Sequence, residues 1–103
     1  MAIIGNPFVG NISKQLSTEE LAQALRLDIA GELEAIIGYE AHAMSSNDEN
    51  VKKVLYHIAD EERHHVGELQ QLLYMISPRE EQHIEKGKQD TKQQLRQNFQ
   101  APM

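Results

Sequence analysis

Length, composition and charge exclude several classes of protein. The chain has 103 residues, a formal net charge of −6 and a pI near 5.3, and it contains no cysteine. This length suits one small domain, and the acidic balance argues against a nucleic-acid partner. The lack of cysteine excludes disulfides and thiolate chemistry, as is common in a reducing cytosol. Since the first residues lack a secretory signal and no apolar run approaches the roughly 20 residues of a membrane span, we expect a soluble, cytoplasmic protein without a membrane partner.

Turn and capping signals divide the chain into predicted helices. Residues 1–16 show no lasting periodicity and are expected to be irregular. The sequence Ser-Thr-Glu-Glu at 17–20 is a capping box, which predicts a helix over about 18–44. Turn-forming residues at 45–50 predict a reversal of the chain, and a second helix is expected over about 48–76.

The C-terminal part is expected to be less regular. Ser77-Pro78 stops the second helix and starts a third, short helix over about 78–86, which should end at Gly87. Residues 88–103 are rich in Gln and Lys and have few bulky apolar side chains, which predicts a polar, loosely docked helix or a tail. The chain has no internal repeat, and residues 17–87 are expected to form its one helical domain.

Each long helix carries ionisable side chains on an otherwise apolar stripe. Steps of three and four residues keep side chains on one face of a helix. The first stripe is Ala22, Leu25, Ile29, Glu32, Ile36, Tyr39 and Ala43. The second stripe is Val51, Leu55, Ile58, Glu62, His65, Leu69 and Leu72. Because an unpartnered charge on a core face costs several kcal/mol, Glu32, Glu62 and His65 are expected to share a partner.

Reversal of the chain at the predicted turn brings these three residues to the same depth. Asn47 is equidistant in sequence from Glu32 and Glu62, so a turn there aligns the two carboxylates across a hairpin. Carboxylate and imidazole donors suit iron and manganese, with zinc as a frequent competitor. We therefore predict that Glu32, Glu62 and His65 bind a metal ion.

Apolar surface and site stoichiometry both predict that two copies of the chain associate. Each long helix should extend about 40 Å, and one hairpin partner leaves a second apolar row of the first helix uncovered. That row is Leu27, Ala30, Ile37, Ala41 and Met44. A dinuclear carboxylate site in a four-helix bundle takes a Glu from two helices and a Glu-x-x-His from two others, and this chain supplies one of each. The predicted fold is therefore all-α, with two long antiparallel helices and a short C-terminal helix, and it dimerises into a four-helix bundle.

Two alternatives to this metal site stay open at the level of sequence. Glu61 and His64 have the same spacing as Glu62 and His65, and together with His57 they could form a surface zinc site. Their row is largely polar, which favours a charged face in solvent instead. Glu62 and His65 could also form a buried hydrogen-bonded pair without metal, although the matched depth of Glu32 favours the metal.

The same residues resemble a known family. The segment 31–35 (Gly-Glu-Leu-Glu-Ala), Tyr39 and the segment 60–65 (Asp-Glu-Glu-Arg-His-His) resemble the encapsulated ferritins, which are ferritin-like cargo proteins of encapsulin nanocompartments. Residues 25–29 and 48–51 are especially similar to the ferritin-like domain that some archaeal encapsulin shells carry at their N-terminus.

This resemblance, which extends over residues 18–76, implies a ferroxidase. It implies that dimers assemble into a ring-shaped decamer and that a di-iron centre forms between two chains. It also implies that Fe(II) is oxidised to Fe(III) for iron storage inside the encapsulin shell. The family's metal ligands fall on Glu32, Glu62 and His65, and Tyr39 takes the place of a tyrosine beside the iron.

The resemblance carries further expectations about metal uptake and location. Glu34 matches one acidic residue on the family's route for incoming metal, whereas Gly31 replaces the other. The implied location is inside a cytoplasmic encapsulin nanocompartment, yet residues 93–103 hold no convincing copy of a shell-targeting peptide. Two other functions stay open, namely a rubrerythrin-like or catalase-like enzyme that acts on peroxide and a metal-free helical interaction module.

Overall fold

Three helices make up the part of the chain that the structure describes. The computed structural model describes residues 15–98, so most of the predicted irregular N-terminal segment and the last residues of the predicted tail lie outside it. The helices are α1 (Thr18–Ser45), α2 (Glu49–Ile76) and α3 (Pro78–Asn98), and residues 15–98 contain no strand. The predicted bounds of the two long helices hold to within one residue at each end, and the all-α prediction is confirmed.

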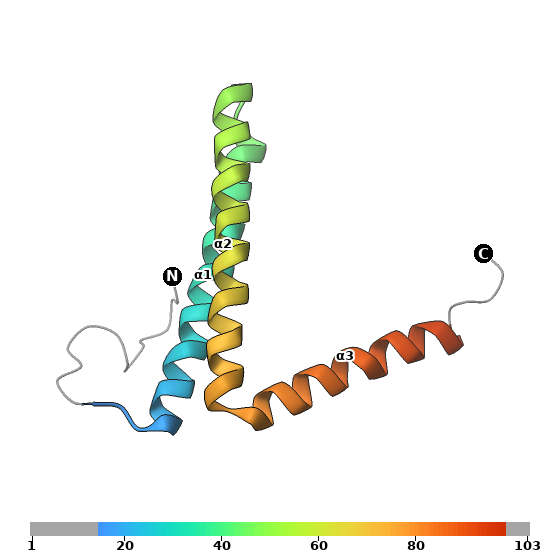
Figure 1. Cartoon of the computed structure of the whole chain (residues 1–103). Helices are drawn as coiled ribbons and strands as arrows, with labels where there is room; N and C mark the ends of the chain where they lie inside the picture. The colour runs from blue at the N-terminus through green and yellow to red at the C-terminus, as the bar shows by residue number, and fades with distance from the viewer. Residues whose placement is uncertain (1–14, 99–103) are drawn as a thin grey trace.

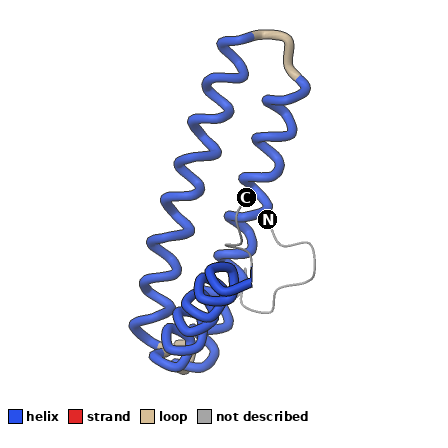
Figure 2. The backbone as a smooth tube through the Cα atoms, turned by 90° about the vertical axis from the view of Figure 1, so that its right-hand side faces the viewer, coloured by secondary structure: helices blue, strands red, loops and turns tan. Residues whose placement is uncertain are grey.

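The two long helices form an antiparallel hairpin, and the third helix leaves it. Figure 1 shows α1 and α2 side by side, with α3 projecting away from the base of the hairpin. Figure 2 shows the short turn that joins α1 to α2 at the opposite end. None of these three helices is long and apolar enough to cross a membrane.

Polar side chains fix where the two long helices begin. The Ser17 hydroxyl accepts a hydrogen bond from the Glu20 backbone N–H at 3.1 Å, and the Glu20 carboxylate accepts one from the Ser17 N–H at 3.0 Å. At α2, the Asp48 carboxylate accepts hydrogen bonds from the N–H groups of Asn50 and Val51 at 2.8 and 3.2 Å. These contacts satisfy N–H groups that lack partners inside the helix, and the predicted capping box is confirmed.

The third helix is longer than the sequence predicted. It continues through Gly87 to Asn98, so the expected end at Gly87 is wrong and residues 88–98 are helical. Glycine inside a helix costs about 1 kcal/mol relative to alanine, but local contacts around it favour the helix. The Lys86 ammonium pairs with Asp90, the Lys88 ammonium pairs with Glu85, and the Thr91 hydroxyl donates to the Gly87 carbonyl.

The core lies on the contact zone between α1 and α2. Its central members are Ala22, Leu25 and Leu73, with Ile29, Leu69 and Ile76 packed against them. The predicted stripe of α1 faces this zone, as its buried residues show: Ala22, Leu25, Ile36 and Ala43. Nearer the turn, Ala43 on α1 and Ala59 on α2 have no exposed surface, so small side chains also lie where the helices meet.

The predicted stripe of α2 faces α1 only in part. Val51 and Leu72, at its two ends, are 45% and 48% exposed, and α2 buries Ala59 and Leu73 instead. The apolar residues of α2 spread over a wide arc, and a single neighbouring helix covers only one edge of it. On α1, Ile37 and Met44 of the second apolar row are also largely exposed, so the single chain leaves apolar surface uncovered on both helices.

Two contacts hold the base of α3 against the hairpin. The Arg26 guanidinium on α1 donates two hydrogen bonds to the Glu80 carboxylate on α3, at 2.7 and 3.1 Å. The Tyr74 hydroxyl on α2 donates to Glu85 on α3 at 3.2 Å. Both contacts lie in the first half of α3, so they set the direction in which the rest of this helix leaves the hairpin.

Loss of the Arg26–Glu80 pair should destabilise the protein at neutral pH but not in acid. The hydrogen bond from Arg26 lowers the pKa of Glu80 below its usual 4.5. The stability from this pair is therefore present above about pH 4.5, and it is lost as the pH falls through the lowered pKa of Glu80. Urea unfolding of Glu80→Gln should show a loss of about 1 kcal/mol near neutral pH that vanishes in strong acid.

The neighbouring Glu81→Gln variant is the matched control. Glu81 is exposed, and its substitution removes the same charge from α3. Equal stability of the two variants at neutral pH would contradict the role given to Arg26 and Glu80.

Candidate metal centre

Three predicted metal ligands meet between the long helices. One ligand atom each of Glu32, Glu62 and His65 lies within 4.8 Å of the others, and we call this group the donor cluster. The Nδ1 atom of His65 lies 2.8 Å from a Glu32 oxygen and 2.9 Å from a Glu62 oxygen. Glu62 and His65 are three residues apart on α2, so they share one face of that helix, and Glu32 reaches them from α1.

The donor cluster is partly buried and opens to one side. The side chains of Glu62 and Glu32 are 16% and 26% exposed, whereas the His65 side chain is 50% exposed. The two carboxylates therefore sit close to the contact zone of the hairpin, and the imidazole sits on its rim. Such a group is accessible to an ion from solvent or to a second protein surface.

The charges in the donor cluster act mainly on His65. Its hydrogen bond to Glu32 raises the pKa of the imidazole above the usual 6.5, and the charges of Glu32 and Glu62 act in the same direction against a smaller effect of burial. One helical turn before Glu32, burial and the Glu32 charge raise the pKa of Asp28. The environment of the donor cluster is thus strongly acidic, and a positive group is favoured there.

The donor set fits a hard or borderline divalent cation. Two carboxylates and one imidazole are ligands that iron, manganese and zinc accept, and three protein donors leave coordination positions open. Both partners of the His65 Nδ1 atom are carboxylate oxygens, which accept hydrogen bonds, so we infer that Nδ1 carries a hydrogen directed between them. A cation would replace this hydrogen and satisfy the same carboxylate oxygens.

Tyr39 and Glu34 lie outside the donor cluster of a single chain. Tyr39 is seven residues beyond Glu32, which places it about 10 Å further along α1. Glu34 does not belong to the group of converging ligands. The roles that the resemblance implies for Tyr39 and Glu34 therefore stay predictions.

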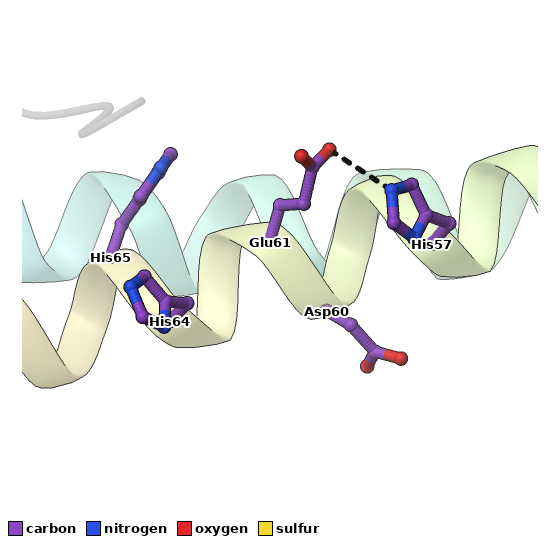
Figure 3. Close-up of a pocket in the computed structure, with 5 residues that line it drawn as sticks. All are labelled: His57, Asp60, Glu61, His64 and His65. Atoms are coloured by element: carbon purple, nitrogen blue, oxygen red, sulfur yellow. Dashed lines mark ion pairs between the residues drawn. The ribbon is translucent and has the colours of Figure 1, made fainter.

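The alternative histidine-rich row faces solvent. Figure 3 shows that Glu61 points toward His57 and that Asp60 and His64 point to other sides of α2. The His57 ring lies 3.8 Å from the Glu61 carboxylate, while the His64 ring lies 3.6 Å from Glu68. The side chains of His57, Glu61 and His64 are 72%, 58% and 75% exposed. Over residues 15–98 the donor cluster is the one group that converges on a point, so a charged face in solvent describes this row better than a zinc site.

A cross-helix contact beside the donor cluster was not predicted from the sequence. The Arg63 guanidinium on α2 contacts Glu40 on α1 at 2.8 Å and Asp60 at 2.9 Å. Arg63 directly follows Glu62, and Glu40 directly follows Tyr39. Spacing alone gives no signal for this pair, because the two residues are not at one depth of the hairpin.

Comparison with known proteins places the chain in a structural class. Residues 19–81 match the sequence model of a family described as "Ubiquinone biosynthesis protein COQ7". The crystal structure of the encapsulated ferritin domain from Pyrococcus furiosus matches with a TM-score of 0.78 at 40% identity. That match covers 89% of this chain and 94% of the other.

Curated relatives are longer proteins that share this segment. The chain is 42% identical over 88 residues to the ferritin-like-encapsulin shell fusion protein of Pyrococcus furiosus, covering 85% of this chain and 26% of the relative. It is 36% identical over 78 residues to the encapsulin nanocompartment cargo protein EncC of Myxococcus xanthus, covering 76% of this chain and 60% of the relative. The chain therefore spans about a quarter of the first relative and three fifths of the second.

A hairpin of two long helices with carboxylate and imidazole donors between them defines a ferritin-like protein. The chain belongs to the encapsulated ferritins, within the ferritin-like group that includes the matched COQ7 family. The family resemblance predicted from the sequence is thereby confirmed.

The pairing of Glu32 with His65 should be visible in the metal-free protein. Its stabilising effect is present below about pH 6.5 and is lost as the pH rises through the raised pKa of His65. Glu32→Gln should lower the pKa of His65, measured by NMR titration of its ring resonances, because Glu32 is the main cause of the shift.

Glu49→Gln provides the control, since it removes the same charge from the start of α2, where the Glu49 side chain is 87% exposed and distant from His65. An unchanged His65 titration in Glu32→Gln would mean that this ion pair does not form in solution.

Proposed function

We propose that this protein is a ferroxidase that oxidises Fe(II) to Fe(III) at a di-iron centre built from Glu32, Glu62 and His65 of two copies. The observation that supports the proposal is the convergence of these three donors on the open side of the hairpin. One chain supplies half of the ligands that a dinuclear carboxylate site of the four-helix type uses. A twofold arrangement of two chains would supply each ligand twice.

The surroundings of His65 support association through this side. Val54 and Leu72 share the His65 side of α2 by helical spacing, and they are 56% and 48% exposed. A second copy on this side would bury these apolar side chains and shield the carboxylates from water. Burial of that apolar surface would be favourable by about 25 cal/mol per Å².

The residues of the donor cluster would have complementary tasks in the reaction. Fe(II) is the substrate, and dioxygen accepts the electrons that it loses. His65 gives up its proton when it becomes a ligand, and the carboxylates of Glu32 and Glu62 favour the more highly charged Fe(III) product through Coulomb attraction. The proposed role of Tyr39 is to orient a Glu32 carboxylate by hydrogen bonding.

Metal delivery and storage are the less direct parts of the proposal. Glu34 would attract incoming Fe(II), and Gly31 contributes no second carboxylate to that route. The named relatives are a shell fusion protein and a nanocompartment cargo protein. We infer that dimers of this chain assemble into a decamer and work inside an encapsulin nanocompartment in the cytoplasm, where the shell retains the ferric product.

Removal of Glu32 should abolish iron oxidation. Anaerobic addition of Fe(II) followed by air should give stoichiometric ferric absorbance with the unmodified protein and none above background with Glu32→Ala. Glu49→Ala should oxidise iron at the unmodified rate, because Glu49 is 87% exposed at the start of α2 and lies far from the donor cluster. Equal rates in all three proteins would rule out the proposed centre, and peroxide consumption in excess of iron oxidation would favour a peroxide enzyme.

A charge placed on the His65 side of α2, about three helical turns from His65, should separate the two copies without touching a ligand. Val54→Glu introduces a carboxylate on the exposed apolar side, so we expect a monomer by native mass spectrometry and a loss of oxidation. Lys53→Glu is the control, because it adds negative charge at the adjacent exposed position. A monomeric Val54→Glu protein with full activity would show that one chain holds a complete centre.

A further inference from the structure

Arg63 follows the cluster residue Glu62 directly, yet its side chain bonds elsewhere. Adjacent residues of a helix point about 100° apart, so Arg63 leaves α2 on another side than Glu62. One guanidinium nitrogen lies 2.8 Å from a Glu40 oxygen on α1, and the other lies 2.9 Å from an Asp60 oxygen on α2. A single permanent positive charge thus joins carboxylates of both long helices, and we call this contact the Arg63–Glu40 bridge.

The bridge is specific for the observed register of the hairpin. Side chains of a helix lean toward its N-terminus, and α1 and α2 run in opposite directions. Arg63 therefore leans toward the turn, and Glu40, which lies nearer the turn, leans back toward Arg63. A slip of one helix along the other by one residue would move the partners by about 1.5 Å and turn one of them by about 100°, which breaks the contact.

The donor cluster creates a need for such a restraint. Glu32 and Glu62 carry like charges at one point between the helices, and Asp28 adds a third one turn away. Like charges in a partly buried place repel each other, and the repulsion acts across the contact between α1 and α2. His65 offsets part of it inside the cluster, whereas Arg63 acts outside the cluster.

We propose that Arg63 is a positioning residue for the metal centre, and that its bridge to Glu40 keeps Glu32 at the depth of Glu62 and His65 before the cation binds. Arg63 does not touch the metal. The bridge preserves the spacing of the donors, so the side chains of the donor cluster lose less conformational freedom when the cation binds. This inference rests on the proposed function only in that the donor cluster binds a divalent cation.

Simple electrostatics makes a different prediction from the bridge. If Arg63 acted only as a nearby positive charge, Arg63→Gln would strengthen cation binding and Glu40→Gln would weaken it. The two effects would then cancel in the double variant. If the bridge matters, each single variant weakens binding, and the double variant is no weaker than either single one.

The test is a double-mutant cycle with Co²⁺ in anaerobic buffer, so that cation binding is measured without oxidation of the metal. Isothermal titration calorimetry at one fixed chain concentration should show a Co²⁺ affinity about fivefold lower in Arg63→Gln, in Glu40→Gln and in the double variant. A fivefold change corresponds to the free energy that one exposed ion pair contributes. Arg63→Lys should recover part of the affinity. The visible spectrum of bound Co²⁺ should change in the Gln variants and return toward the original in Arg63→Lys.

Glu49→Gln is the matched control, because it removes another glutamate of an ion pair, with Lys52, at the distant start of α2. It should leave Co²⁺ affinity and spectrum unchanged, and circular dichroism should show folded helices in every variant. Opposite effects of the two single variants, or parental affinity in both, would overturn the bridge while leaving the metal centre in place. Absence of Co²⁺ binding by the unmodified protein would overturn both proposals.

Discussion

The rest of this structure depends on two carboxylates and one imidazole that are held together between two helices. Glu32 and Glu62 repel each other there, and a chain of this size has little interior in which to shield them. His65 offsets part of the repulsion by placing its Nδ1 proton between the carboxylates, and its hydrogen bond to Glu32 raises the pKa of the imidazole. The arrangement is therefore poised for a cation, because a divalent ion gives both carboxylates a stronger partner than the proton does.

The same constraint bears on the side of the hairpin that is open to solvent. Two helices share one contact zone, and that zone is filled by small or aliphatic side chains such as Ala43, Ala59 and Leu73. The donor cluster sits at its edge with His65 half exposed, and exposed apolar side chains extend along α2 on the same side. In the proposed dinuclear centre, a second copy would supply both the missing shielding and the remaining ligands.

Much of this could be predicted from the sequence, and each miss has its own physical cause. The long helices could be located because their caps, Ser17 and Asp48, are local sequence signals. The three donors could be located because a turn at Asn47 places Glu32 and Glu62 at the same depth of the hairpin. The end of α3 was missed because Gly87 was given more weight than the ion pairs around it. The Arg63–Glu40 contact was missed because it depends on the lean of long side chains across an antiparallel pair, which residue spacing does not encode.

Two Glu-x-x-His pairs one residue apart show how helix geometry selects the chemistry. Glu61 and His64 have the same spacing as Glu62 and His65, but they turn toward solvent and pair with different residues of α2. A shift of one position rotates a side chain by about 100°, which is enough to exchange a partly buried partner on α1 for water. The matched sequence segment recurs in a relative named as a shell fusion protein and in one named as a cargo protein. Because the donors come from the hairpin itself, we infer that the centre needs correct helix register and a second copy, and that a covalent link to a shell is not required for its chemistry.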